Sequence, residues 1–459
     1  MHGDPARCLG ASMAARSENG VLARTMSAGV LQRARAAVLR SDGTRKLAAD
    51  TMWVALDSLG ARGLALLAMM LAARLLGVRE FGELAAVLGT ATLVAGLLAD
   101  SMRYTAATQI AASTGATRAV RSGIVTLVIW ATAAAAMLCA LGMLLCAPLL
   151  ARRVFAAASL EPALRVAALF LLCEALGGLA QGILTGFRFF RTLAATGLAR
   201  GLLALPLVAV YGTSTVSALW AFVLASAAAL VIRAAAIGAT LRSQGLSARA
   251  PITAAELAVL WRVSVPGLMA SLITVPVNWL AMVMLVRSPG GYAQMGVLGA
   301  ANQWFSVLLF IPSILTTVTL PLFSQRYASG DTESLRRALG YSLRMSLLAA
   351  APPALVVAAA SPWIMAFYGP EFVRGWPALA LVAVAAITSS MINMLLNLLG
   401  AAGGMFRVLA SQLCWGVAYL LSAYVLLGQG LGAAAIAAAM LLGSVCRLAF
   451  GAYWVRRIV

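Results

Sequence analysis

The chain has 459 residues, of which 62% are hydrophobic and 10% charged, and its mean hydropathy is +0.94. This is too little polar surface to cover a soluble globule of that length, so the composition indicates a polytopic membrane protein. The formal net charge of +20 does not indicate a nucleic-acid partner. A basic excess spread over short loops is what the anionic inner leaflet of a membrane selects.

Residues 1–48 form a basic N-terminal tail without the apolar core of a signal peptide. The segment VLQRARAAVLR, Val30 to Arg40, is typical of a basic amphipathic helix that lies on the inner membrane surface. Two alternatives are a disordered tail and a true start at Met26.

Apolar runs of roughly 20 residues, each long enough to cross a hydrocarbon core, occupy the rest of the chain. They predict an all-α polytopic membrane protein with about twelve transmembrane helices, because the strands of the alternative, a β-barrel, would alternate polar and apolar residues. The runs lie at 51–73, 82–99, 123–147, 164–186, 192–211, 217–240, 261–286, 296–320, 341–360, 377–399, 407–427 and 432–454.

The arginines predict the orientation of these helices, because cytoplasmic loops keep an excess of basic residues. With the N-terminus inside, the cytoplasmic loops and the C-terminal tail carry about twice as many arginines as the outward loops. Both termini are therefore expected to face the cytoplasm.

A weak internal repeat suggests two lobes. A shift of 210 residues aligns LLGVREFGELAAVLG (75–89) with LVRSPGGYAQMGVLG (285–299), and both segments break the helix pattern between two spans. Six helices per repeat give both repeats the same topology, with a cleft between them. We expect an N-lobe at 49–245 and a C-lobe at 246–459.

Polar side chains recur on one face of several spans. In the fourth span they are Glu174, Gly178, Gln181, Thr185 and Arg188, which follow helical spacing. Buried polar groups are costly in hydrocarbon, so this face must meet either neighbouring helices or an aqueous cavity.

Ionisable residues within spans are the strongest candidates for function, because they commonly line substrate paths. Arg62 lies near the middle of the first span and Arg200 within the fifth. An ion pair of Arg62 with Asp57 or Glu174 is the structural alternative. Arg233 and Arg447 lie nearer the cytoplasmic ends, where such side chains are expected to reach the interface.

Several kinds of chemistry have no sequence support. The single histidine is His2, the single lysine is Lys46, and no phosphate-binding loop motif occurs. The six cysteines include no CxxC pair, so neither a disulfide framework nor a metal site is indicated. The longest outward loops have about 16 residues, whereas a glycan polymerase or ligase is expected to need a larger outward domain. Transport is favoured over an enzyme.

Four segments carry a family resemblance: AARLLGVREFGELAAV (72–87), QGILTGFRFFRTLA (181–194), FIPSILTTVTLPLFSQRYASGD (310–331) and MAFYGPEFVRGWPALALVAVA (365–385). From about residue 48 to the end, the chain resembles the bacterial polysaccharide or oligosaccharide flippases of the MATE-like MOP superfamily. The resemblance implies movement of a polyprenyl-pyrophosphate-linked oligosaccharide from the inner to the outer leaflet by alternating access, for cell-surface polysaccharide assembly.

A pyrophosphate and acidic sugars need cationic, hydrogen-bonding walls to cross a low-dielectric core. Arg62 and Arg200 are the expected source of charge. The expected hydrogen-bonding residues are Gln181, Asn278, Asn302, Asn393 and Asn397.

Glu174 has two candidate roles: to fix an arginine in place, or, with Asp57 nearby, to bind a coupling proton or sodium ion. We expect no cofactor, no metal, a monomer, and a polysaccharide polymerase as a candidate partner. The alternative functions are a cation-coupled MATE-type exporter of small molecules, a lipid II flippase with fourteen spans, and a membrane-embedded glycan polymerase or ligase.

Overall fold

The computed structural model describes residues 42–113, 117–252, 257–258 and 265–457, with side chains from residue 60 onward apart from 265–271 and 317–318. The chain divides into two compact units, residues 1–56 and 57–459, and the second unit contains all the candidate site residues. The expected surface helix from Val30 to Arg40 lies outside the described residues.

The described elements are helical, and no strand occurs in these ranges. The helices are α2 (Asp42–Ala112), α3 (Arg118–Leu149), α4 (Glu161–Gly186), α5 (Phe190–Tyr211), α6 (Thr215–Ser243), α8 (Val265–Val286), α9 (Gly291–Leu308), α10 (Phe310–Ala328), α11 (Thr332–Ala359), α12 (Ser361–Tyr368), α13 (Trp376–Ala401), α14 (Met405–Gly428) and α15 (Ala433–Val455). A π-helical turn, Leu150–Val154, follows α3, and the 3₁₀ turns Ala158–Leu160 and Pro370–Gly375 precede α4 and α13.

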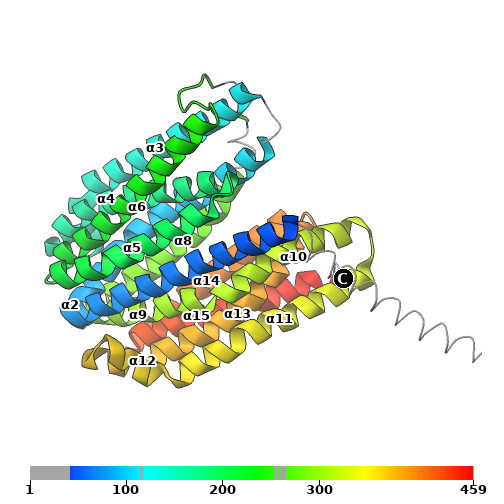
Figure 1. Cartoon of the computed structure of the whole chain (residues 1–459). Coiled ribbons are helices and arrows are strands. Elements are labelled where there is room, and N and C mark those ends of the chain that lie inside the picture. Colours follow the sequence, from blue (N-terminus) through cyan, green and yellow to red (C-terminus); the bar gives the residue numbers. More distant parts are fainter. Residues whose placement is uncertain (1–41, 114–116, 253–256, 259–264, 458–459) are drawn as a thin grey trace, which may run out of the picture. The chain divides into compact units, whose positions relative to one another are not determined.

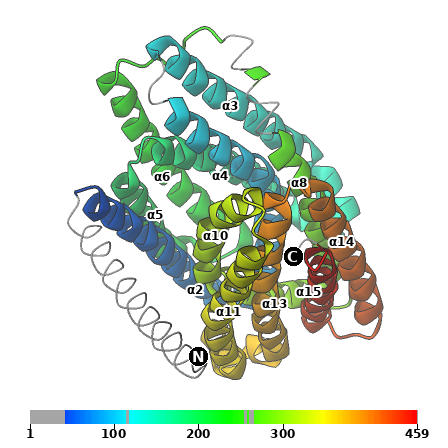
Figure 2. The ribbon, with the colours of Figure 1, turned by 90° about the vertical axis from the view of Figure 1, so that its right-hand side faces the viewer.

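We call residues 57–243 the first half and residues 265–457 the second half. In the first half, α4 packs against α3 and α6, and α5 packs against α6. In the second half, α13 packs against α15 and α11, and α14 packs against α15. Figures 1 and 2 show these helices gathered side by side within each half. The division into a tail at 1–48 and lobes at 49–245 and 246–459 stays a prediction.

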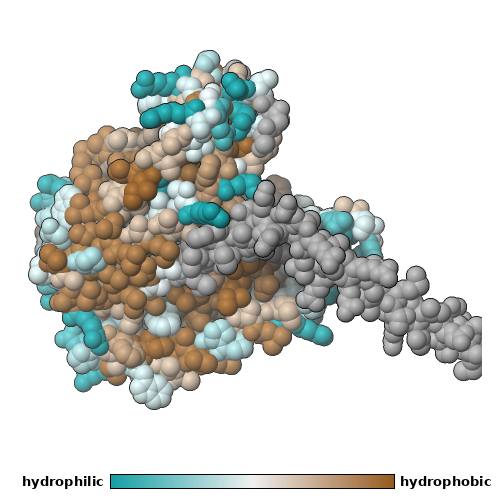
Figure 3. Space-filling view, viewed as in Figure 1, coloured by the Kyte–Doolittle hydropathy of each residue, from teal (hydrophilic) through white to brown (hydrophobic). Residues whose placement is uncertain are grey.

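Helix lengths and surface character make this a multi-pass membrane protein. Nine described helices are long and apolar enough to cross a bilayer, or ten if α9 and α10 together form one bent span. Leu138 and Leu145 on α3 are 71% and 70% exposed, as expected for side chains that contact lipid. In Figure 3 hydrophobic residues form a broad area, and hydrophilic residues gather mainly toward the helix ends.

Helix α2 accounts for two of the predicted spans. Its candidate span, Gly60–Ala112, has 53 residues, which would extend about 80 Å as one straight helix, far beyond a hydrocarbon core of about 30 Å. Gly77 breaks it, with non-helical angles of φ 75° and ψ 173°. When α2 is counted as two passes, the α9–α10 pair as one and α8 as one, the described helices agree with the expected twelve.

The eighth predicted span, 296–320, is wrong as a single continuous helix. The chain bends by 43° between α9 and α10, at Leu309. Pro312, three residues into the apolar run after the bend, lacks an N–H and cannot donate to the Leu308 carbonyl, which explains the break. Helix α11, which corresponds to the ninth predicted span at 341–360, begins earlier than predicted, at Thr332. The Asp331 carboxylate caps it by accepting a hydrogen bond of 2.8 Å from the Ser334 backbone N–H.

Candidate functional site

The ionisable residues predicted for the site lie near the middle of their helices. Glu174 is 13 residues from the first residue of α4 and 12 from its last, or about 18–20 Å from each end. Arg200 is similarly central in α5. Both charges therefore lie deep in the span, where an ionised side chain needs a partner or water.

Glu174 forms an ion pair with Arg200 and joins three helices. Its Oε1 lies 2.7 Å from Arg200 Nη2, and Arg200 Nη1 donates to Oε2 at 3.3 Å. From α6, the Ser226 hydroxyl donates to Oε1 at 3.0 Å. The side chains keep 37% exposure at Arg200 and 23% at Glu174, so this pair is only partly shielded by the protein.

Arg233 adds a second guanidinium one helical turn away. Its Nε donates to the Thr196 hydroxyl at 3.0 Å, and its Nη1 donates to the Gly177 carbonyl at 3.3 Å. Thr196 precedes Arg200 by one turn of α5, and Gly177 follows Glu174 by about one turn of α4. We call Glu174, Thr196, Arg200, Ser226 and Arg233 the arginine cluster, which contains two guanidiniums and one carboxylate.

Sequence reasoning missed the contacts of Arg233, for which it predicted a side chain reaching the membrane interface. The structure instead directs this side chain to α4 and α5. A usable signal was present, because Ser226 and Arg233 are seven residues apart and so share one face of α6.

Close helix packing places Arg62 at the level of Arg200. A Cβ added to Gly60 of α2 would overlap Leu198 of α5, and a Cβ added to Gly201 would overlap Leu64. Small residues allow helix backbones to approach in this way. Arg62 lies between Gly60 and Leu64, and Arg200 lies between Leu198 and Gly201, so the two arginines occupy the same depth on adjacent helices.

Arg62 itself contacts the second half. Its Nη1 donates to the Ser306 carbonyl at 2.8 Å, and its guanidinium carbon lies 5.3 Å from the centre of the Phe310 ring. These contacts flank the break between α9 and α10. The Asp57 side chain lies outside the described residues, and Glu174, the other predicted partner of Arg62, binds Arg200 and Ser226.

The predicted amide residues are not gathered into one cluster. Asn302 is exposed on α9, one turn from Ser306, whereas Gln181 and Asn393 are half-buried on α4 and α13. Asn278 donates to the Thr274 carbonyl of its own helix at 2.8 Å. Asn397 donates to the Thr316 carbonyl at 2.8 Å and thereby ties α13 to α10.

The residues of the predicted polar face of α4 contact different helices rather than one cavity. Glu174 faces α5 and α6, but a Cβ added to Gly178 would overlap Ala99 of α2. The Thr185 hydroxyl donates to the Gln181 carbonyl of its own helix at 2.8 Å. Much of this face therefore serves helix packing. Among the described residues no group of three or more His, Cys, Asp or Glu could hold a metal ion.

The fold places this chain in a structural class. It is similar to a multidrug resistance MATE family transporter of the MOP superfamily in an inward-facing conformation, with 14% identity, 89% of this chain and 98% of that chain covered, and a TM-score of 0.72. It is also similar to the lipid II flippase MurJ in an inward closed conformation, with 13% identity, coverage of 88% and 87%, and a TM-score of 0.69. The protein therefore has a MATE-like fold, as predicted.

The sequence places the chain more narrowly. Residues 47–326 match the model of the polysaccharide biosynthesis protein family, and the chain belongs to this family. It is 27% identical over 305 residues to the EPS I polysaccharide export inner membrane protein EpsE of Ralstonia nicotianae, which covers 64% of this chain and 68% of that protein.

Proposed function

We propose that this protein moves a polyprenyl-pyrophosphate-linked oligosaccharide from the cytoplasmic to the outer leaflet of a bacterial inner membrane, for assembly of cell-surface polysaccharide. The arginine cluster carries the proposal, because it combines two guanidiniums with one carboxylate in the middle of membrane-spanning helices. Membership in the polysaccharide biosynthesis protein family and similarity to a polysaccharide export protein support the same substrate class.

The chemistry of the cluster suits an anionic headgroup. Guanidiniums bind phosphate and carboxylate oxygens through charge-assisted, bidentate hydrogen bonds, which are strongest where water is scarce. Glu174 holds Arg200 in place, and the cluster contains two guanidiniums for one carboxylate. Arg62 adds a guanidinium at the same depth, between the halves, and Asn302 and Gln181 are available for sugar hydroxyls.

The proposed cycle is alternating access between the two halves, with the lipid tail remaining in the bilayer. We assign the end of the bundle that contains Gly77, Glu161 and Gly291 to the outer side, with both termini in the cytoplasm. The distribution of arginines between the loops supports this assignment.

Transport is proposed to be driven by a proton or sodium gradient, with Glu174 and Asp57 as the candidate coupling carboxylates and no other cofactor. We further propose a monomer that acts beside a polysaccharide polymerase and has no catalytic activity of its own. A cation-coupled small-molecule exporter is the alternative function, and acidic cavity walls would favour it over the arginines present here.

The test is the sidedness of lipid-linked oligosaccharide in cells that lack the protein, probed with a membrane-impermeant glycan-modifying reagent. We expect the glycan to accumulate on the inner leaflet and the wild-type chain to restore its outward movement. Normal sidedness in the deletion strain would refute the flippase proposal. Normal sidedness with normal chain elongation would favour the exporter, and normal sidedness with loss of chain elongation would favour a polymerase or ligase.

A further inference from the structure

The two halves meet at the Gly77 end through a pair of equivalent arginine contacts. Arg74 of the first half donates from Nε to the Phe367 carbonyl at 2.6 Å. Arg287 of the second half donates from Nε to the Val154 carbonyl at 2.9 Å. The arginines are 213 residues apart, and so are the two acceptors. Each contact is therefore the counterpart of the other under the internal repeat.

The helix packing behind these arginines is reciprocal as well. A Cβ added to Gly82 would fall on the Tyr292 carbonyl, and a Cβ added to Gly296 would fall on the Val78 carbonyl. Both pairs of equivalent positions are 214 residues apart. Reciprocal contacts of this kind are the signature of a twofold interface, here between the two halves of one chain.

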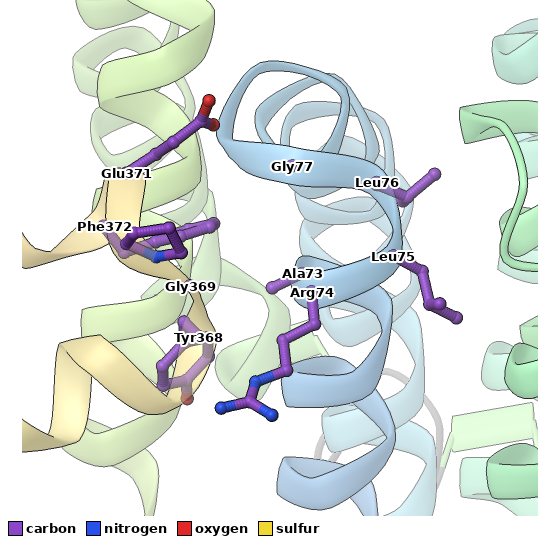
Figure 4. Close-up of a pocket in the computed structure, with 10 residues that line it drawn as sticks. Ala73, Arg74, Leu75, Leu76, Gly77, Tyr368, Gly369, Glu371 and Phe372 are labelled. Carbon is purple, nitrogen blue, oxygen red and sulfur yellow. The ribbon is translucent and has the colours of Figure 1, made fainter.

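The two contacts differ in their neighbours. Beside Arg74, the Glu371 carboxylate accepts a hydrogen bond of 3.1 Å from the Val78 N–H, which begins the helix after the Gly77 break. Figure 4 shows Arg74 extending from α2 toward the facing segment, with Glu371 beside the turn at Gly77. The two segments, 73–77 and 368–372, line an open pocket of about 370 Å³. Burial raises the pKa of Tyr368 on this pocket wall, so its phenol stays neutral.

Beside Arg287, the partners are a hydroxyl and backbone carbonyls. The Tyr292 hydroxyl donates to the Phe155 carbonyl at 2.7 Å, and Arg287 Nη2 also donates to the Arg153 carbonyl. All these acceptors belong to the turn that follows α3. Arg74 thus contacts the C-terminal end of α12, and Arg287 contacts the π-helical turn after α3, each in the opposite half.

We propose that Arg74 and Arg287 are a twofold-related pair of gate residues, which hold the Gly77 end closed and must release together before it can open. The proposal rests on the transport function proposed above. Both arginines occupy exposed positions, so water can replace the carbonyls when the contacts break and no unpaired charge is left buried. Because the contacts are related by the twofold, one rotation of the halves breaks both.

The test measures access to a cysteine between the halves. Ser306→Cys is introduced into a cysteine-free chain and labelled with an impermeant maleimide in membrane vesicles of each orientation. We expect Arg74→Gln and Arg287→Gln each to raise labelling from the Gly77 side about tenfold or more, as expected from the loss of one charge-assisted hydrogen bond at Arg74 and of two at Arg287. The double variant should exceed both single variants.

Two arginines at the same end provide matched controls. Arg79 is 80% exposed and pairs weakly with Glu83 of its own helix, and Arg374 is exposed in the turn before α13. Arg79→Gln and Arg374→Gln should leave labelling unchanged. If labelling of the double variant stays within about twofold of the parent from both sides, the gate proposal is overturned.

A cross-link provides the opposite test in case the glutamine variants fold poorly. Arg74→Cys and Phe367→Cys are joined by a short bifunctional thiol reagent before the maleimide is added, and Ser306→Cys alone receives the same treatment. Labelling from the Gly77 side should be lower in the cross-linked chain than in this control; equal labelling would contradict a gate. Labelling needs no substrate, so it separates the two proposals: a working gate without glycan movement would refute the flippase alone.

Discussion

The Glu174 carboxylate lies 2.7 Å from the Arg200 guanidinium, halfway along two adjacent helices, and a hydroxyl from a third helix donates to the same oxygen. An acid that looked anomalous inside an apolar helix is therefore the counter-charge of an arginine. Arg233 donates to Thr196 one helical turn away, so two guanidiniums lie close to one carboxylate, and the proposal of an anionic substrate rests on this composition.

The ion pair predicts that removing one partner destabilises the protein more than removing both. Glu174→Gln removes the carboxylate and leaves Arg200 without its counter-charge, which we expect to cost about 1–3 kcal/mol and to lower the thermal midpoint in detergent. Arg200→Gln with Glu174→Gln should recover part of this loss. A loss in the double variant equal to the sum of the losses in Glu174→Gln and Arg200→Gln alone would contradict a direct energetic coupling of the two residues.

The same Glu174→Gln variant tests ion coupling. If Glu174 serves only to position Arg200, transport by the variant should keep its dependence on the proton or sodium gradient. Transport would be measured in proteoliposomes with an imposed gradient and compared with the wild-type chain. Loss of gradient dependence together with retained transport would instead make Glu174 a coupling carboxylate.

Arg233→Gln should reduce movement of an anionic lipid-linked glycan by about tenfold or more, because a neutral amide can still bond to Thr196 but cannot offset a phosphate charge. Arg242→Gln, nine residues further along the same helix and exposed, is the matched control and should transport normally. Equal effects of the two changes would indicate a general loss of positive charge rather than a role for the cluster.

Arg62→Ala should abolish transport while the chain still inserts and folds. The change removes the contacts to Ser306 and Phe310 and the cation between the halves. The glycan-sidedness assay reports activity, and size-exclusion profiles in detergent report folding. Unchanged transport would remove Arg62 from the proposed site.

Gly182→Ala should destabilise the first half by about 1–3 kcal/mol, because the new Cβ would lie within 3.0 Å of the Arg103 backbone. Gly142→Ala is the control, since a Cβ there meets no atom within 4 Å. The measurement is the thermal midpoint and the yield of folded protein. Equal behaviour of both variants would contradict close packing of α4 on α2.

Hydropathy alone could locate most of the membrane-spanning segments, because a bilayer requires about 20 apolar residues per pass. It could not predict the break at Leu309, since the run stays apolar through this point and the signal for the break is the missing N–H of Pro312, which hydropathy does not record. The repeat shows a similar limit. The sequence alignment suggested a shift of 210 residues, whereas the paired contacts give 213 and 214, because weak identity allows a slip of one helical turn.

The sequence by itself determined the membrane class, the approximate helix number and the depth of Glu174 and Arg200, since all of these depend on the distribution of charge along apolar runs. The tertiary structure decided which charges meet. Glu174 pairs with Arg200, and Arg233 bonds to Thr196, because the rotation of each helix is set by packing against neighbours distant in the chain. The depth of a side chain in the membrane follows from its position along an apolar run, whereas its ion-pair or hydrogen-bond partner depends on how the helices pack.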